Sequence, residues 1–199
     1  WEYDVLFLGD SIMNTGVFPM EMWEKYGIAG YNIASYGNTL PITYWALQNA
    51  LDYAKPKLVV LDVQGVSKSY KLSGNSSDVH TAFDCYSISK TKIEALDDLM
   101  DDPNAVDDDG VAYVDMKWEY LFTLGKYHAR WSELTDTDFH PVYNREKGAK
   151  SVIAVADVGD YDLIDEDMAT EESGQTGFVY LRKIIEDCQA RGIDVLLVH

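Results

Sequence analysis

The sequence Asp4-Val5-Leu6-Phe7-Leu8-Gly9-Asp10-Ser11, near the start of the chain, gives the first clear structural signal. Four apolar residues follow one another without a break and stop at Gly-Asp-Ser. A short continuous apolar run that ends at a turn is typical of a strand buried on both faces, as in a parallel sheet. Ser11 then follows the carboxyl end of a first strand, at the edge of an open α/β sheet where ligands bind.

Ser11 and Asp10 each have two interpretations. Ser11 is either a nucleophile or a cap for the segment that follows, since Asp and Ser are both common N-caps. Asp10 either tunes that nucleophile or accepts backbone N–H bonds that hold the turn. Gly9 fits all of these interpretations, because glycine permits a turn that a side chain would obstruct.

Strands and helices alternate from here to residue 65. Apolar runs predict strands at 28–34 and 58–63, and apolar residues at helical spacing predict a helix at 41–53 between them. Near the other end of the chain, an amphipathic helix at 178–191 precedes a strand at 193–199. This alternation predicts an α/β fold with a parallel sheet and right-handed crossovers.

The interval 66–177 breaks the alternation and is interpreted as an insertion between the third and fourth strands. Insertions at that edge of a sheet often cover the ligand site. We expect an irregular polar stretch at 66–84 and helical segments at 87–100 and 111–131. A loop at 132–148, a short strand at 152–158 and an acidic loop at 161–174 should follow.

Composition limits the class of protein. The 199 residues suit one domain, and a hydrophobic content of 47% is enough to build a core. The formal net charge is −18, from 34 acidic and 16 basic residues. So acidic a surface repels phosphate backbones and anionic membranes, and we expect no nucleic-acid partner. No run reaches the ~18 apolar residues of a membrane span, and no signal peptide is recognisable.

We expect no metal site. Cys85 and Cys188 form no Cys-x-x-Cys pattern and are interpreted as two free thiols rather than a disulfide. The acidic stretch 101–110 lacks the ordered oxygen spacing and the final Glu of a calcium-binding EF-hand loop. It is interpreted as a solvated loop, which is the usual role of an acidic run.

Histidines and aromatic residues also have structural interpretations beside functional ones. Because histidine fills many roles, His80, His128 and His140 are interpreted as structural or surface residues. His199, at the end of a strand, is expected to be a wall of the site. The aromatic residues of the insertion either pack in the core or form a sugar-binding platform, and these are Trp118, Tyr120, Tyr127 and Trp131.

Three polar loops converge at the carboxyl edge of the predicted sheet. They carry Gly9-Asp10-Ser11, Gly37-Asn38 and Asp62-Val63-Gln64-Gly65. A nucleophilic serine needs a base and donors for the developing oxyanion. The N–H groups of Ser11 and Gly37 and the side-chain amide of Gln64 are candidate donors, and Gly37 lets a substrate approach closely. The residues expected to support this site are Asp10, Asn38, Asp62 and His199.

The pattern of these three loops resembles the first three blocks of the SGNH (GDSL-like) hydrolases. Gly9-Asp10-Ser11 follows a first strand, Gly37 follows a second, and an amide follows a third. The resemblance covers residues 4–65 and, as the following helix and strand, 178–199. It implies a flavodoxin-like three-layer α/β/α fold, Ser11 as nucleophile, and Ser11 and Gly37 as oxyanion donors. It also implies a serine-dependent O-acyl esterase or acyltransferase that needs no cofactor, acting on an acylated carbohydrate or another small ester.

A finer likeness, around residues 20–30 and 55–63, is to a bacterial group related to acyl-modifying proteins. It implies an extracytoplasmic or cell-envelope location.

Two features depart from the family pattern. The third block, Gly-x-Asn in the family, is Asp62-Val63-Gln64 here, so the amide stands on a longer arm. The fourth block, Asp-x-x-His after a fifth strand, is not in this sequence. Because the sequence starts and stops on strands, we expect residues 1–199 to be one incomplete domain of a longer protein, with the base outside them.

The sequence also allows two other classes of function. The first is a non-catalytic binding module that keeps the fold, which the altered third block favours. The second is a flavodoxin-like phosphate binder, which is disfavoured because the first loop lacks the glycine-rich or hydroxyl-rich run that cradles phosphate.

Overall fold

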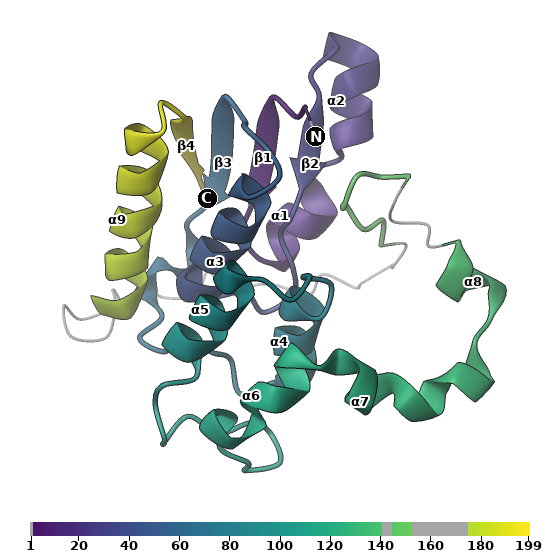
Figure 1. Ribbon diagram of the computed structural model, residues 1–199. Helices are drawn as coiled ribbons and strands as arrows, with labels where there is room; N and C mark the ends of the chain where they lie inside the picture. Colours follow the sequence, from purple (N-terminus) through teal and green to yellow (C-terminus); the bar gives the residue numbers. More distant parts are fainter. Residues whose placement is uncertain (1, 141–144, 153–174) are drawn as a thin grey trace, which may run out of the picture.

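The computed structural model describes residues 2–140, 145–152 and 175–199. Four parallel strands form one sheet in the order β2-β1-β3-β4 (Figure 1). The strands are β1 Val5–Leu8, β2 Gly30–Asn32, β3 Leu58–Asp62 and β4 Asp194–Val198. The predicted parallel sheet is confirmed, although β2 is shorter than the run 28–34 from which it was predicted.

β1 lies between β2 and β3, and its pairing register with them brings the ends of the three strands to the same edge of the sheet. Val5 pairs with Gly30 of β2 and with Leu58 of β3, so the three strands run in register. All four residues of β1 are buried, as expected for a strand that is covered on both faces. The loops that follow β1, β2 and β3 therefore gather at one edge.

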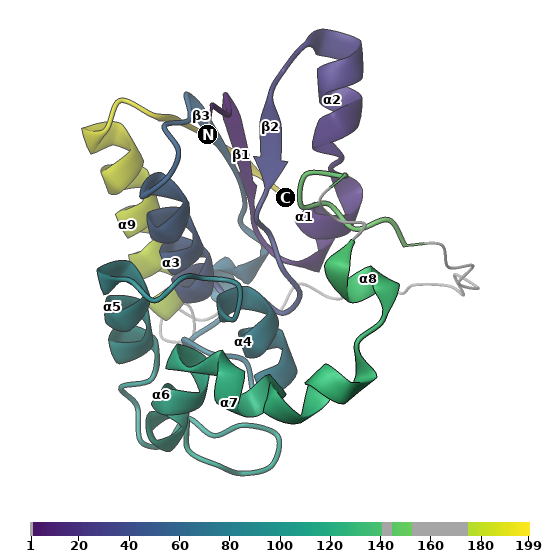
Figure 2. The same cartoon turned by 45° about the vertical axis from the view of Figure 1, so that its right-hand side comes forward.

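Helices cover both faces of the sheet and make three layers (Figures 1 and 2). On one face, Leu6 and Leu8 pack against residues of α3 and α9. On the other face, Val5 and Phe7 pack against Met13 of α1, with α2 beside it. These helices are α1 Ser11–Gly16, α2 Pro19–Tyr26, α3 Leu40–Leu51 and α9 Gln175–Ala190.

The insertion between β3 and β4 is mostly helical in its described residues, and the expectation of an irregular stretch at 66–84 is wrong. Asn75 accepts the N–H of Ser77 at 3.0 Å and starts α4, which buries Val79 and Phe83. The few apolar residues of this polar segment give only a weak sequence signal for a helix. The stability of α4 comes instead from its packing against other helices. The elements are η1 Gln64–Ser67, α4 Ser76–Phe83, α5 Lys90–Leu99, α6 Tyr113–Leu121, α7 Thr123–Tyr127, η2 His128–Glu133 and α8 Asp136–Phe139.

Other predictions for the insertion have mixed outcomes. The helices expected at 87–100 and 111–131 correspond to α5 and to the series α6, α7 and η2, whereas the loop expected at 132–148 contains the short helix α8. The strand at 152–158 and the loop at 161–174 lie outside the described residues, apart from Val152, which is in no strand.

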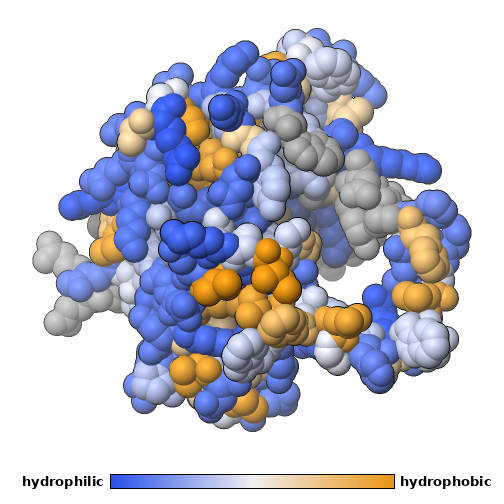
Figure 3. Space-filling model, viewed as in Figure 1, coloured by the Kyte–Doolittle hydropathy of each residue, from blue (hydrophilic) through white to orange (hydrophobic). Residues whose placement is uncertain are grey.

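The aromatic residues of the insertion divide between the core and the surface. Tyr120 is fully buried in a core that α4, α5 and α6 share with Ile42 of α3. Trp118 is 69% exposed and stacks on Phe122 with 5.6 Å between ring centroids. Figure 3 shows further apolar side chains exposed on this part of the surface. Packing thus explains Tyr120 but not the exposed rings.

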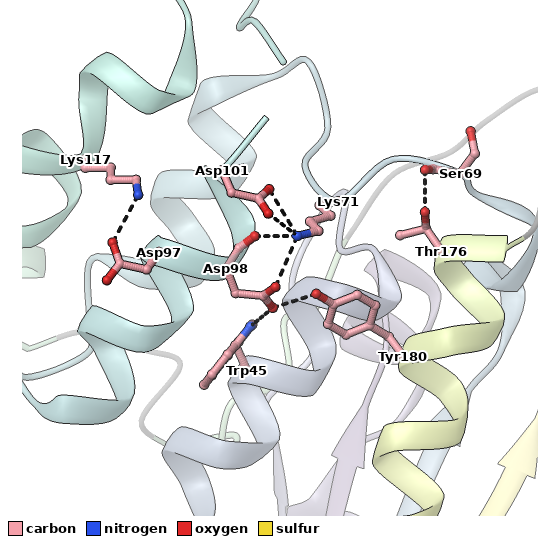
Figure 4. Close-up of polar contacts among 9 residues, drawn as sticks. All are labelled: Trp45, Ser69, Lys71, Asp97, Asp98, Asp101, Lys117, Thr176 and Tyr180. Carbon is pink, nitrogen blue, oxygen red and sulfur yellow. Dashed lines mark hydrogen bonds and ion pairs between the residues drawn. The ribbon is translucent and has the colours of Figure 1, made fainter. Parts of the chain in front are cut away.

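Asp98 of α5 ties the insertion to the sheet domain (Figure 4). Its Oδ2 accepts the indole N–H of Trp45 at 2.7 Å and the hydroxyl of Tyr180 at 2.5 Å. Lys71 donates to its Oδ1 at 3.1 Å. Burial by itself would raise the pKa of Asp98, but these hydrogen bonds lower it overall. The ionised carboxylate therefore joins α3, α5 and α9.

We expect Asp98→Ala to lower the free energy of unfolding by about 2 kcal/mol at pH 7, because three donors lose their acceptor. Urea unfolding measures this change. A carboxyl group with a lowered pKa contributes stability above its unfolded pKa and loses it as the pH falls through the folded pKa. The difference between the variant and the unmodified chain should therefore shrink in strong acid.

Asp97→Ala is the matched control for this prediction, since Asp97 is the neighbouring residue and its carboxylate, 68% exposed, pairs only with Lys117 among the described residues (Figure 4). We expect a change below about 0.5 kcal/mol. Equal losses in the two variants would contradict the proposed role of the Asp98 network.

Candidate functional site

Gly9 packs β1 tightly against the end of β3. Its φ is 149°, and a Cβ atom there would lie 2.6 Å from the Cβ of Asp62. Such a distance is far below van der Waals contact, so a side chain at this position would push the two loops apart. Glycine is therefore needed here for close packing as well as for the turn.

Ser11 is the first residue of α1, and Asp10, not Ser11, is its cap. The Asp10 carboxylate accepts the N–H of Ile12 at 3.0 Å, which agrees with the structural interpretation of Asp10. Ser11 is partly exposed, and its carbonyl accepts the hydroxyl of Thr15 at 2.8 Å. In the described part of the chain, nothing hydrogen-bonds to the Ser11 hydroxyl, which remains available to a ligand.

The loop after β2 is fixed to the loop after β1 by a buried amide. Asn38 is 4% exposed, and its Nδ2 donates to the carbonyl of Gly9 at 3.1 Å. The N–H of Ser35 donates to the same carbonyl at 3.4 Å. These two bonds bring the Gly37 loop beside the Ser11 loop, as the sequence predicted for strands ending at one edge.

Two backbone donors remain unused at this edge. Within residues 2–140, 145–152 and 175–199, neither the N–H of Ser11 nor the N–H of Gly37 donates to a protein acceptor. Gly37 has a φ of 65°, a conformation that side chains rarely adopt. Both groups are thus free to bind a carbonyl oxygen.

Asp78 of α4 lies directly against Gly37, and sequence reasoning missed it. A Cβ atom at Gly37 would overlap the Asp78 carboxylate, so the space left by the missing side chain adjoins this group. The signal that could have revealed it is Asn75-Ser76-Ser77-Asp78, a helix start with an acidic first turn. Nothing in the sequence indicates where this helix packs.

The third loop has its amide turned outward. Asp62 ends β3, is 7% exposed, and accepts the N–H of Gln64 through its Oδ1 at 3.0 Å. Gln64 begins η1 and is exposed. Among the described residues its side chain contacts neither the Ser11 loop nor the Gly37 loop through a hydrogen bond. The position expected for a third oxyanion donor thus supports the loop through its backbone.

Negative charge is concentrated at this edge. Burial raises the pKa of Asp62, the N–H of Gln64 opposes this shift, the nearby Asp10 carboxylate adds to it, and His199 weakens it. His199 itself is exposed and follows β4 directly. With Asp78, three carboxylates therefore surround the Ser11 and Gly37 loops.

The other histidine and cysteine predictions can be located as well. His80 is 3% exposed, its Nδ1 lies 2.9 Å from Asp84, and it stacks on Tyr120 at 4.0 Å, which agrees with a structural role. Cys85 and Cys188 are free thiols, as expected. His128 and His140 are exposed. The part of the chain that the structure describes contains no group of three His, Cys, Asp or Glu side chains placed to hold a metal ion.

Comparison with protein-family models, with curated proteins and with solved structures finds no match for this chain. Among the described residues, no helix combines the length and the apolar character that a bilayer crossing requires. The fold is therefore established as a parallel α/β sheet with covering helices, and the function has to be argued from the site.

We expect Asp62→Asn to raise the melting temperature at pH 7 by a few degrees. Its raised pKa means that ionisation of Asp62 destabilises the fold, so this contribution to stability is present below the unfolded pKa and lost as the pH rises through the folded pKa. Asparagine removes the charge and keeps an oxygen for the Gln64 N–H. Thermal unfolding at several pH values should show the gain vanish below about pH 3.9.

Asp4→Asn is the control of opposite sign, because the hydrogen bond from Lys57 lowers the pKa of Asp4. It should give no gain at pH 7. A gain of the same size in both variants would show that net charge, rather than the surroundings of Asp62, controls the melting temperature.

Proposed function

We propose that this chain is a serine-dependent O-acyl ester hydrolase or acyltransferase of the SGNH type, with Ser11 as its nucleophile. One observation carries the proposal. An unbonded hydroxyl and two unused N–H donors, those of Ser11 and Gly37, lie on adjacent loops at one edge of the sheet. A nucleophile beside paired donors is the arrangement that acyl transfer requires.

The reaction follows from these groups. Ser11 Oγ attacks the ester carbonyl, and the N–H groups of Ser11 and Gly37 stabilise the negative oxygen of the tetrahedral intermediate. The serine proton passes to a base and then to the departing alcohol, which leaves an acyl-serine. Water or a second alcohol takes up the acyl group. The family resemblance assigns the base to the histidine of an Asp-x-x-His block, which this sequence does not contain.

A non-catalytic binding module is the second candidate, and a specific observation favours it. The Asp78 carboxylate against Gly37 and the buried Asp62 place negative charge where an oxyanion would form. Like charges repel strongly at short range when partly shielded from water. A protein that binds an ester or alcohol without turnover would tolerate this charge, whereas an esterase has to overcome it.

Ser11→Ala tests the proposal in the full-length protein. We expect the hydrolysis of p-nitrophenyl acetate to fall by about 10³-fold or more, because the nucleophile is lost. A fluorophosphonate probe should label the native protein at Ser11, as located by peptide mass spectrometry. Ser67→Ala, which changes an exposed serine at the end of η1, is the matched control and should leave both signals intact. Equal activity in all three proteins would remove the support for an enzyme.

Asp78→Asn distinguishes the two candidates. If Ser11 and Gly37 hold an oxyanion, removing the neighbouring negative charge should raise kcat for p-nitrophenyl acetate by roughly tenfold, which corresponds to about 1.4 kcal/mol. Asp84→Asn is the matched control, because it neutralises a carboxylate that pairs with His80 inside the insertion. That variant should not speed the reaction. Unchanged or lower kcat in Asp78→Asn would contradict the oxyanion role of Gly37, and no Ser11-dependent hydrolysis by either protein would argue for the binding module.

A further inference from the structure

Three short helices of the insertion form an arm in which almost every residue is exposed. The arm consists of α7, η2 and α8 and leaves the rest of the molecule at the end of α6 (Figures 1 and 2). All residues of the stretch 124–136 are exposed, and neither α7 nor η2 buries a residue. The hydroxyl of Tyr127 donates to Asp84 at 2.6 Å and joins the arm to the end of α4.

Helices as short as those of the arm are not stable by themselves. α7 has five residues, η2 has six and α8 has four. Isolated helices of fewer than about 12–15 residues are marginal in water, and in proteins the packing of an apolar face supplies the missing stability. The described part of the chain provides little such packing for the arm, so a second surface that covers the arm would stabilise it.

The arm and the adjoining end of α6 expose enough apolar surface for a stable interface. Leu124 is 82% exposed and Trp131 is 76% exposed. The other large apolar side chains exposed here are Trp118, Phe122, Tyr127, Leu134 and Phe139 (Figure 3). Since one aromatic side chain can bury about 150–250 Å², these five rings and two leucines offer on the order of 800 Å². A standard interface buries about 800 Å² on each partner, whereas the largest apolar patch of a typical monomer is about 300–600 Å².

Charges on this surface are balanced, although the whole chain has a net charge of −18. The stretch 118–134 contains the basic residues Lys126 and Arg130 and the acidic residues Glu119 and Glu133. Arg130 forms an ion pair inside the arm, whereas Lys126 and Glu133 have no ion-pair partner among the described residues. In a two-fold interface the same patch lies on both sides, so a patch that carries both signs can pair with itself.

We propose that two copies of this chain associate arm to arm about a two-fold axis, and that the exposed side chains of 118–139 form the contact. Two molecules of charge −18 repel each other, and a contact through a stretch without net charge avoids adding to this repulsion. The same overall charge opposes binding of the arm to an anionic membrane. The proposal is independent of the chemistry at Ser11.

Light scattering and analytical ultracentrifugation of the full-length protein test the association. We expect a dimer, and Trp131→Glu should raise its dissociation constant by about 30-fold or more, because tryptophans at the centre of an interface are common hot spots. Trp23→Glu is the matched control, since Trp23 is an exposed tryptophan of α2 outside the arm, and it should change the constant by less than about threefold. Circular dichroism checks that both variants fold. A monomer at all concentrations up to about 100 µM, or equal effects of the two substitutions, would overturn the proposal.

A charge exchange tests whether the arm contacts the same arm of the second copy. Lys126→Glu leaves the stretch 118–134 with a net charge of about −2, and Glu133→Lys leaves it with about +2. Each variant alone should dimerise about tenfold more weakly, because like charges then face each other, and a mixture of the two should form heterodimers as tight as the unmodified dimer. If the arm instead contacts the acidic body of the second copy, Glu133→Lys would strengthen the association, and the arm-to-arm contact would be refuted.

Salt and vesicles separate this contact from the other possible occupants of the arm. Raising the NaCl concentration from about 0.05 M to about 0.5 M should tighten the dimer, because salt screens the repulsion between two strongly acidic molecules. Weaker association at high salt would indicate attraction between the arm and an acidic surface and would contradict the proposal. Vesicles of phosphatidylcholine test a neutral membrane as the occupant. A protein that stays monomeric and sediments with these vesicles would assign the arm to a lipid surface and overturn the dimer.

Discussion

The contact between Gly9 and Asp62 is the constraint on which the site depends. β1 is buried on both faces and pairs in register with β2 and β3, so the loops after the three strands must share a small space. Only a residue without a side chain allows the end of β1 to approach Asp62 this closely. The Gly9 carbonyl is then left to accept from Asn38, and this bond positions the Gly37 loop.

Close packing at this edge has an electrostatic consequence. The same approach that joins the loops buries Asp62 near Asp10, and α4 adds Asp78 beside Gly37. Like charges held close together lower the stability of the fold. Clusters of this kind are nevertheless common at catalytic and binding sites. The carboxylates also make the edge hostile to anions, so a neutral ester or a hydroxylated ligand suits it better than a phosphate.

The sheet and its loops were predictable because their signals are local. Continuous apolar runs such as Val5–Leu8 identify buried strands, and Gly9 and Gly37 mark the turns that follow them. α4 was missed, since its few apolar residues acquire meaning only when they pack on α5 and α6. The outward side chain of Gln64 and the position of Asp78 were beyond prediction for the same reason. Both depend on contacts between segments far apart in sequence.

The insertion is part of the candidate site rather than an appendage to it. α4 presents Asp78 to Gly37 and buries Phe83 in the insertion core, so moving that core would move the carboxylate. The core is in turn anchored to the sheet domain, because Ile42 of α3 belongs to it and Asp98 binds side chains of α3 and α9. The position of the Asp78 carboxylate beside the Gly37 loop thus depends on the packing of Phe83 and the rest of the insertion core on the other side of α4.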